Sequence, residues 1–177
     1  MIKRTMLLMG LSFLFSKAVM AQAKVGETEI TKKNSWFKAG INTGLPIGNV
    51  ANVSSVTAGI DLKGQLMMTR HWGIGLTGSY NHFFGKKGFK SFGTIPLGGF
   101  VRYYFSSEGF FAGADGGYSF ITGASGGKGG PFVRPQLGYH NYDWNIYGFY
   151  SHVLRSDANA GALQYAGIGC TYNVRFR

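Results

Sequence analysis

Eight charged side chains fall on one face of the strands that the sequence predicts, where they could pair with one another or line an ion path. The alternating residues between them are apolar, aromatic, small or uncharged. Charges that face a narrow interior need partners, so we expect contacts among these side chains, tyrosines and trapped water. We expect this network to fill the lumen as a polar plug and to fix the register of the strands. We predict that Asp61 and Asp115 are partnered by Arg102, Arg134 or Lys63. The inward charged residues are Lys38, Asp61, Lys63, Arg102, Asp115, Arg134, Asp143 and Arg175.

These charges are positioned by eight predicted β-strands. Along each segment, apolar residues alternate with polar residues or glycine, which is the period of two expected for a strand. In segment 109–120, for example, Asp115 shares its parity with Ser119, whereas Ala112 and Tyr118 take the other face. The predicted strands are 36–47, 55–66, 71–82, 93–105, 109–120, 132–140, 143–152 and 162–176.

Two prolines lie inside these predicted strands. Pro96 falls near one end of segment 93–105, and Pro135 lies deeper in segment 132–140. Each proline removes a backbone donor from the strand ladder. We therefore predict a bulge or a local break at Pro135.

No predicted helix is left to cover the apolar faces of the strands. A soluble sheet needs a second layer there, whereas a membrane barrel turns that face toward lipid. The short turns 67–70, 106–108 and 141–142 alternate with the longer loops 48–54, 83–92, 121–131 and 153–161. This alternation is typical of brief periplasmic turns and longer surface loops. The sequence predicts an all-β fold: one eight-stranded antiparallel up-and-down transmembrane β-barrel over residues 36–177, with both termini periplasmic.

Outward aromatic residues fall into two bands. Trp72, Tyr103 and Trp144 lie near the predicted periplasmic ends of their strands, and Tyr80 and Tyr118 lie near the surface ends. Amphipathic rings favour the headgroup level of a membrane, so this sorting supports the barrel.

Residues 1–23 have the features of a secretory signal peptide. Lys3 and Arg4 precede a short apolar run, and small residues place cleavage after Ala21 or Ala23. The apolar run is too short for a spanning helix, which needs about 20 residues. Residues 24–35 are polar and without pattern, so we predict a flexible periplasmic segment that leads into the barrel.

The formal net charge is +11, and removal of the signal lowers it by three. Basic residues are divided between the inward parity and the loops, without a basic helix or an aromatic-interleaved patch, so nucleic-acid binding is not predicted. Anionic lipopolysaccharide is the expected partner of the loops, although a merely solvated basic rim stays open. The surface-loop basic residues are Lys86, Lys87, Lys90, Lys128 and Arg155.

Several segments resemble the small outer-membrane β-barrel (porin-like) proteins of Gram-negative bacteria. They are the signal peptide, the eight alternating strands, Ile95-Pro96-Leu97 followed by Arg102-Tyr103-Tyr104-Phe105, and the ending Asn173-Val174-Arg175-Phe176-Arg177. The resemblance covers nearly the whole mature chain and is architectural, so it implies a fold and a location but no active residues. It implies outer-membrane lipid and the barrel-assembly machinery as partners, with Phe176 as the aromatic read during assembly. Arg177 follows that aromatic, which would weaken the recognition slightly. We expect a monomer.

A lipid A-modifying barrel enzyme is the catalytic alternative. Such a site needs a nucleophile, a base and an orienting carboxylate. Ser151, His152, Ser156 and Asp157 lie in a suitable place, but the His-x-Ser-Asn pattern expected of a deacylase is missing, and the last strand has no Glu. The histidines lack metal-ligand spacing, and the single cysteine, Cys170, can form no internal disulfide. We predict no catalytic residue, no metal site and no cofactor.

Two functions therefore remain open. One is a structural or surface-interaction barrel with a plugged polar lumen and basic extracellular loops, and the other is a narrow porin-like channel for small solutes. The interior of an eight-stranded barrel is just wide enough for side chains to fill, which favours the plugged barrel.

Overall fold

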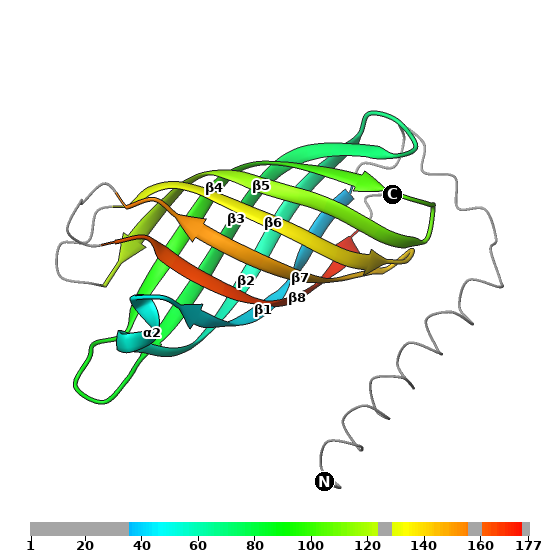
Figure 1. Cartoon of the computed structure of the whole chain (residues 1–177). Coiled ribbons are helices and arrows are strands. Elements are labelled where there is room, and N and C mark those ends of the chain that lie inside the picture. Colours follow the sequence, from blue (N-terminus) through cyan, green and yellow to red (C-terminus); the bar gives the residue numbers. More distant parts are fainter. Residues whose placement is uncertain (1–35, 124–128, 156–160, 175–177) are drawn as a thin grey trace, which may run out of the picture.

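The chain folds into one closed barrel of eight antiparallel strands, in which each strand pairs with its neighbour in sequence and the last pairs with the first (Figure 1). The computed structural model describes residues 36–123, 129–155 and 161–174. The predicted signal peptide 1–23 and segment 24–35 lie outside these ranges. The elements are β1 (Trp36–Ile47), α2 (Val50–Val53), β2 (Ser54–Met67), β3 (Trp72–Gly85), β4 (Phe92–Tyr104), β5 (Gly109–Thr122), β6 (Gly130–His140), β7 (Trp144–Val153) and β8 (Leu163–Val174).

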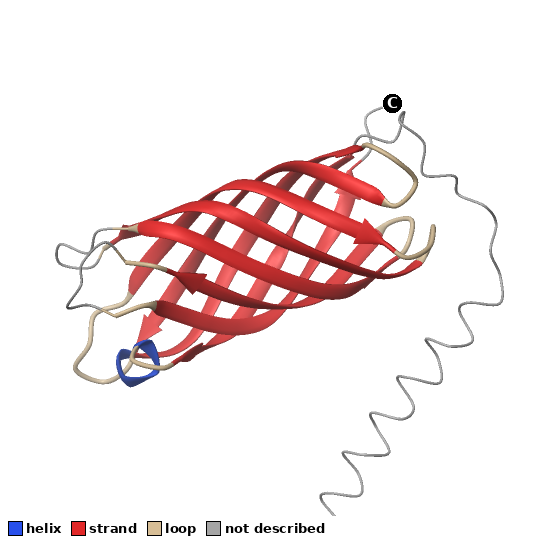
Figure 2. Ribbon diagram, turned by 45° about the horizontal axis from the view of Figure 1, so that its top comes forward, coloured by secondary structure: helices blue, strands red, loops and turns tan. Residues whose placement is uncertain are grey.

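The up-and-down connections place two different ends on the barrel. The turns β2–β3, β4–β5 and β6–β7 share one end, called here the short-turn end, and α2 and the β3–β4 turn lie at the opposite end, called here the α2 end (Figures 1 and 2). All eight predicted strands and their antiparallel order are confirmed. Among the described residues, no helix is long and apolar enough to cross a membrane.

Two predicted connections differ from the structure. The segment 48–54 was expected to be a loop, but it contains the single helical turn α2, in which the Ala51 amide donates to the Gly48 carbonyl at 3.0 Å. Gly48 has a positive φ of 63°, a conformation that suits glycine and turns the chain out of β1. Strand β3 continues to Gly85 and β4 begins at Phe92, so the connection is residues 86–91, shorter than the predicted loop 83–92. The added residues of β3 stay paired with β2.

Of the bulge or local break predicted at Pro135, the structure has a local break in the pairing with β7 and no bulge. Pro135 pairs with Ala114 of β5 in an unbroken register. Toward β7, the pairing passes from Val133–His152 to Gln136–Phe149 without a change of register, so only the residues between them leave the ladder. A missing N–H interrupts pairing on one side of a strand without requiring an extra residue.

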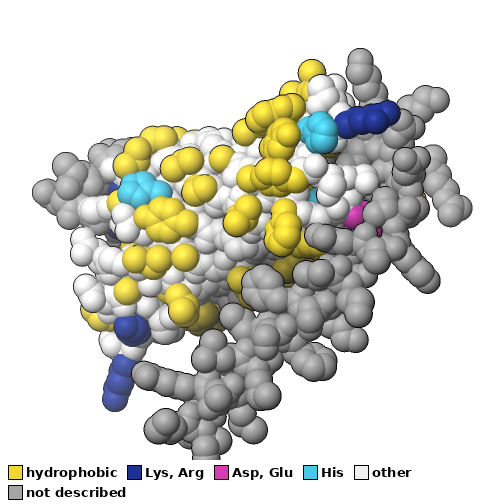
Figure 3. All heavy atoms as spheres, turned by 45° about the vertical axis from the view of Figure 1, so that its right-hand side comes forward, with side chains coloured by type: hydrophobic (Ala, Val, Ile, Leu, Met, Phe, Trp, Pro, Cys, Tyr) yellow, Lys and Arg dark blue, Asp and Glu magenta, His cyan; other side chains and the backbone are white. Residues whose placement is uncertain are grey.

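Side chains alternate between the lumen and the outer wall, except at the irregularity between Ser54 and Val56 at the start of β2. Leu76 is 74% exposed and Ile41 is 68% exposed on the outer wall, whereas Lys38, Asp61 and Arg102 inside are 0% exposed. Figure 3 shows apolar side chains spread over the wall, with Lys and Arg confined to the two ends of the visible face. An uncovered apolar wall around a polar interior is the inverse of a soluble barrel, and it fits a hydrocarbon surround.

The predicted aromatic bands lie at the two ends of the wall. At the short-turn end, Trp72 packs edge-on against Tyr103, and Trp144 packs against Tyr172, each with ring centroids 5.0 Å apart. At the α2 end, Tyr118 packs against Phe120 at 4.9 Å. Amphipathic rings favour the headgroup level of a membrane, so rings near both ends of the wall fit a barrel that spans one.

Neighbouring strands approach each other so closely at certain inward positions that only glycine fits there. A Cβ at Gly75 would overlap the carbonyl oxygen of Gly64 and approach Phe100 Cε1 to 2.8 Å. Gly64 itself faces outward, and a Cβ there would meet nothing within 4 Å.

We predict that Gly75→Ala destabilises the folded barrel by about 1–3 kcal/mol, because strand β3 must shift to relieve the overlap. Gly64→Ala is the matched control and should leave stability near that of the wild type. The measurement is urea unfolding in detergent micelles, followed by tryptophan fluorescence. Equal stability of the two variants would contradict the close approach.

Candidate functional site

The Asp61 carboxylate is the most heavily bonded group in the lumen. Arg134 donates from Nη1 to Oδ1 at 3.0 Å and from Nη2 to Oδ2 at 3.2 Å. Ser79 Oγ donates to Oδ1 and Tyr147 Oη donates to Oδ2, both at 2.5 Å. Because these four residues belong to β2, β3, β6 and β7, one carboxylate ties together strands on opposite sides of the barrel.

A second ion pair joins Lys63 and Asp115 across the lumen. The Lys63 Nζ lies 2.5 Å from Asp115 Oδ2, and both side chains are buried. Lys63 Nζ also lies over the ring of Phe100, 5.2 Å from its centroid. Both predicted carboxylates are thus partnered, one by Arg134 and the other by Lys63.

Arg102 is not a carboxylate partner, although it was predicted as a candidate. It donates from Nη2 to Gln136 Oε1 at 3.1 Å and from Nη1 to Asn145 Oδ1 at 3.4 Å. Its guanidinium lies 4.5 Å from the centroid of Phe111. Amide oxygens and an aromatic face therefore stabilise this cation in place of an anion.

Lys38 shares the same amide oxygen. Its Nζ donates to Asn145 Oδ1 at 2.9 Å and to Tyr104 Oη at 3.4 Å. Asn145 in turn donates from Nδ2 to Asn173 Oδ1 at 2.7 Å, and Tyr104 donates to Gln65 Oε1 at 2.7 Å. The polar network therefore continues from the ion pairs toward the short-turn end.

Two of the predicted lumen residues do not lie on a described strand. Asp143 lies just before β7, half-buried in the turn at the rim, and not in the strand predicted for it. Arg175 and the assembly aromatic Phe176 lie outside the described residues. Several network members were recognised only as inward positions without a role. They are Gln65, Ser79, Tyr104, Gln136, Asn145 and Tyr147.

An apolar cluster closes the lumen at the α2 end. Phe83 of β3 stacks on Phe92 with ring centroids 4.6 Å apart and meets Tyr165 edge-on at 5.2 Å. Val50 of α2 and Leu163 of β8 are buried in the same cluster. This apolar cluster was not predicted, because its members come from strand ends and from a helical turn that was expected to be a loop.

The β3–β4 turn, residues 86–91, carries most of the described loop lysines in a fixed conformation. The Lys86 amide donates to Val53 O at 2.9 Å, and its Nζ donates to Ala51 O at 2.6 Å, so this predicted lipopolysaccharide contact anchors the turn to α2. Lys87 and Lys90 are exposed. Arg155 is half-buried at the start of the β7–β8 connection, and Lys128 lies outside the described residues.

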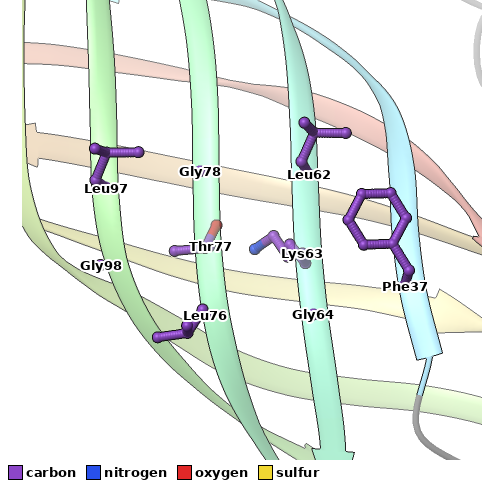
Figure 4. Close-up of a pocket in the computed structure, with 9 residues that line it drawn as sticks. All are labelled: Phe37, Leu62, Lys63, Gly64, Leu76, Thr77, Gly78, Leu97 and Gly98. Carbon is purple, nitrogen blue, oxygen red and sulfur yellow. The ribbon is translucent and has the colours of Figure 1, made fainter.

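A hollow of about 610 Å³ opens on the outer wall over β1–β4 (Figure 4). Its rim is made of outward apolar side chains, and its floor is backbone, because outward Gly64 and Gly78 carry no side chain. Its lining residues are Phe37, Leu62, Lys63, Gly64, Leu76, Thr77, Gly78, Leu97 and Gly98.

The described residues hold no group of three His, Cys, Asp or Glu side chains that would suit a metal ion. Ser151 and His152 lie on opposite faces of β7, with Ser151 buried in the lumen. His152 contacts Tyr150 Oη at 3.3 Å and Gln164 Nε2 at 3.2 Å, which are not carboxylates.

Comparisons with known proteins find the fold and no sequence relative. No family model matches the chain, and no curated protein matches it. The N-terminal β-barrel domain of Pseudomonas aeruginosa OprF is similar with a TM-score of 0.51 and 13% identity, covering 80% of this chain and 98% of that one. The attachment invasion locus protein Ail of Yersinia pestis has a TM-score of 0.51 and 14% identity, covering 79% and 97%. The chain thus has the fold of small eight-stranded transmembrane barrels.

The ion-pair geometry makes a sharp stability prediction. Asp61→Ala leaves Arg134 buried without its carboxylate, so we expect a loss of about 3–5 kcal/mol in unfolding free energy. Ser119→Ala is the control, because the buried Ser119 hydroxyl has no hydrogen-bond partner, and it should change stability little. Thermal unfolding in detergent micelles measures both. An Asp61→Ala protein as stable as Ser119→Ala would rule out a structural role for this pair.

Proposed function

We propose that this protein is a non-catalytic, monomeric barrel of the Gram-negative outer membrane with a structural or surface-interaction role. Its termini lie in the periplasm and its α2 end faces the cell exterior. The barrel-assembly machinery would insert it, and lipopolysaccharide would surround its α2 end.

The filled lumen is the observation that carries this proposal. Two ion pairs cross its middle, Arg102 and Lys38 fill the short-turn side, and the cluster around Phe83 and Tyr165 closes the α2 end. A hydrated solute would have to separate buried opposite charges and displace packed rings. Because both steps cost free energy, the lumen side chains are better suited to stabilising the barrel than to conducting solutes.

The wall and the connections support the location. Apolar side chains cover the barrel outside, and aromatic pairs lie at both of its ends. The longer sequence connections, with Lys87 and Lys90, share the α2 end, whereas brief turns share the other. Brief turns on the periplasmic side and longer connections outside are usual for outer-membrane barrels. The predicted signal peptide agrees with export from the cytoplasm.

The placement of Ser151 and His152 supports the non-catalytic part of this proposal, whereas Ser156 and Asp157 lie outside the described residues. A hydrolytic site needs a nucleophile within hydrogen-bond reach of its base. Ser151 and His152 cannot satisfy this requirement, since they project from opposite faces of one strand. The lumen carboxylates are already occupied by Arg134 and Lys63.

We expect the protein to fractionate with the outer membrane. Barrels of this kind keep their fold in detergent until they are heated, so the unheated and boiled samples should migrate differently in gel electrophoresis. Recovery in the inner membrane or in the soluble fraction, or a single band before and after heating, would refute the location or the stable barrel.

The alternative function is a narrow channel for small solutes, which the polar lining of the lumen favours. Buried polar atoms such as those of Asn42, Asn81 and Thr94 have no hydrogen-bond partner in the protein and could contact water. Among the described residues, the apolar cluster lies between these positions and the α2 end, and the ion pairs, Arg102 and Lys38 lie toward the short-turn end.

Conductance in planar bilayers separates the two functions. We expect the purified protein to give no current above that of the bare bilayer, because its lumen is closed by packed side chains. A general porin added afterwards serves as the positive control. Reproducible unit conductance steps from the wild-type protein would replace the structural function with the channel.

A further inference from the structure

The outer face of β3 forms a continuous track from the hollow to the charged β3–β4 turn. Leu76 and Gly78 line the hollow, and Tyr80, His82 and Phe84 follow at alternate positions toward the α2 end. These five residues are called here the β3 face. From the hollow toward the α2 end, the β3 face is first apolar and then aromatic, and it ends at a basic turn. A membrane lipid has the same order from its acyl chains to its charged headgroup.

The aromatic part of the β3 face is tightly built. Tyr80 Oη lies 3.3 Å from His82 Nδ1, and the rings of His82 and Phe84 meet edge-on with centroids 4.7 Å apart. A Cβ at Gly93 of β4 would approach Tyr80 Oη to 2.9 Å, which shows that the tyrosine ring lies across that glycine. Rings with polar tips prefer the boundary between hydrocarbon and headgroups.

The turn above these rings is basic, exposed and held in place. Lys87 and Lys90 are exposed, and Phe89 between them is 54% exposed. Gly88 supplies a positive φ of 90°, Phe89 N donates to Lys86 O at 2.9 Å, and Ser91 Oγ accepts from Gly85 N at 3.0 Å. No Asp or Glu occurs in the described connections at the α2 end. A rigid tip of two cations around an aromatic ring is complementary to an anionic, amphipathic partner.

The α2-side edge of the hollow lies about one leaflet below the β3–β4 turn. Gly78 lies six residues below Phe84, or about 20 Å along a strand that rises about 3.4 Å per residue. With the usual strand tilt of about 40°, this is a depth of about 15 Å, half of a hydrocarbon core about 30 Å thick. The edge of the hollow at Gly78 therefore lies where an acyl chain anchored at the turn would end, and Gly64, which pairs with Leu76, lies about 5 Å deeper.

We propose that the β3 face and the β3–β4 turn bind one lipopolysaccharide molecule through its lipid A part. Lys87 and Lys90 contact the phosphates, Phe89 and the rings of Tyr80, His82 and Phe84 lie at the boundary of sugar and acyl chain, and one acyl chain descends into the hollow. This site rests on the proposed function in one respect, namely that the α2 end faces the cell exterior. The lipid A part of lipopolysaccharide carries both the phosphates that the lysines contact and the acyl chain that enters the hollow.

Gly64 makes the acyl part of the site testable on its own. The glycine forms part of the floor of the hollow, and a side chain added there meets no protein atom within 4 Å of its Cβ. Leucine at this position would occupy the hollow without displacing any strand. Its effect on binding therefore reports on occupancy of the hollow.

The experiment titrates the purified full-length mature protein in neutral detergent with rough-type lipopolysaccharide and counts bound copies by native mass spectrometry. We expect one saturable copy for the wild type. Lys87→Gln/Lys90→Gln should weaken binding about thirtyfold, which corresponds to about 1 kcal/mol for each lysine near an anionic surface. The charge-conserving Lys87→Arg/Lys90→Arg should bind as the wild type does. Gly64→Leu should weaken binding several-fold while keeping the heat-modifiable band.

Unchanged affinity of Lys87→Gln/Lys90→Gln overturns the proposal, and so does equal binding of dephosphorylated lipopolysaccharide or of phosphatidylglycerol. Unchanged binding by Gly64→Leu overturns the placement of the acyl chain. This binding test and the test of the proposed function can fail independently of each other. A closed barrel in the outer membrane without lipopolysaccharide binding would refute only this site, whereas conductance steps would refute only the closed lumen.

Discussion

Charged side chains inside this barrel must find partners in the protein, because the lumen is too narrow to be freely hydrated. The rest of the structure depends on this constraint. Asp61 meets this need with four hydrogen bonds, which come from Arg134, Ser79 and Tyr147. Because the donors lie on β3, β6 and β7, the carboxylate fixes strands that share no ladder with β2 as well as the neighbouring one. A wall of backbone hydrogen bonds alone would resist sliding less, since each ladder holds only adjacent strands.

Cations outnumber carboxylates among the buried lumen side chains, and aromatic rings make up much of the difference. Arg134 lies 3.9 Å from the centroid of Phe149, Arg102 lies 4.5 Å from that of Phe111, and Lys63 lies 5.2 Å from that of Phe100. A ring face attracts a cation without itself needing to be neutralised, and it fills volume that water would otherwise occupy. Packing and charge compensation are therefore achieved by the same side chains.

The two ends of the barrel are built on different physical principles. At the short-turn end, amides and tyrosines continue the polar network through Asn145 and Tyr104. At the α2 end, apolar rings and the helical turn exclude water, and Lys86 fastens the β3–β4 turn to that helix. The barrel thus has an apolar cluster beneath exposed lysines at one end and a hydrogen-bonded polar network at the other.

Alternation of residue types along the strands was enough to predict the barrel, its strand order and the facing of nearly every residue. A charge such as Arg102 or Lys38 has no tolerable place on a wall of hydrocarbon, so period two alone determined which side it takes. The partners of the charges could not be predicted in this way. Asp61 and Arg134 lie on strands far apart in the closed sheet, and only the stagger and curvature of the barrel bring their side chains to one level. The same geometry gave Arg102 amide and ring partners. The apolar cluster likewise joins residues from the ends of strands that are distant in sequence with Val50 of α2, a helical turn without a repeating pattern. The sequence by itself determined which side chains face the lumen, because parity is a local property. The tertiary structure alone decided which of them meet, because that depends on how the strands are staggered around the ring.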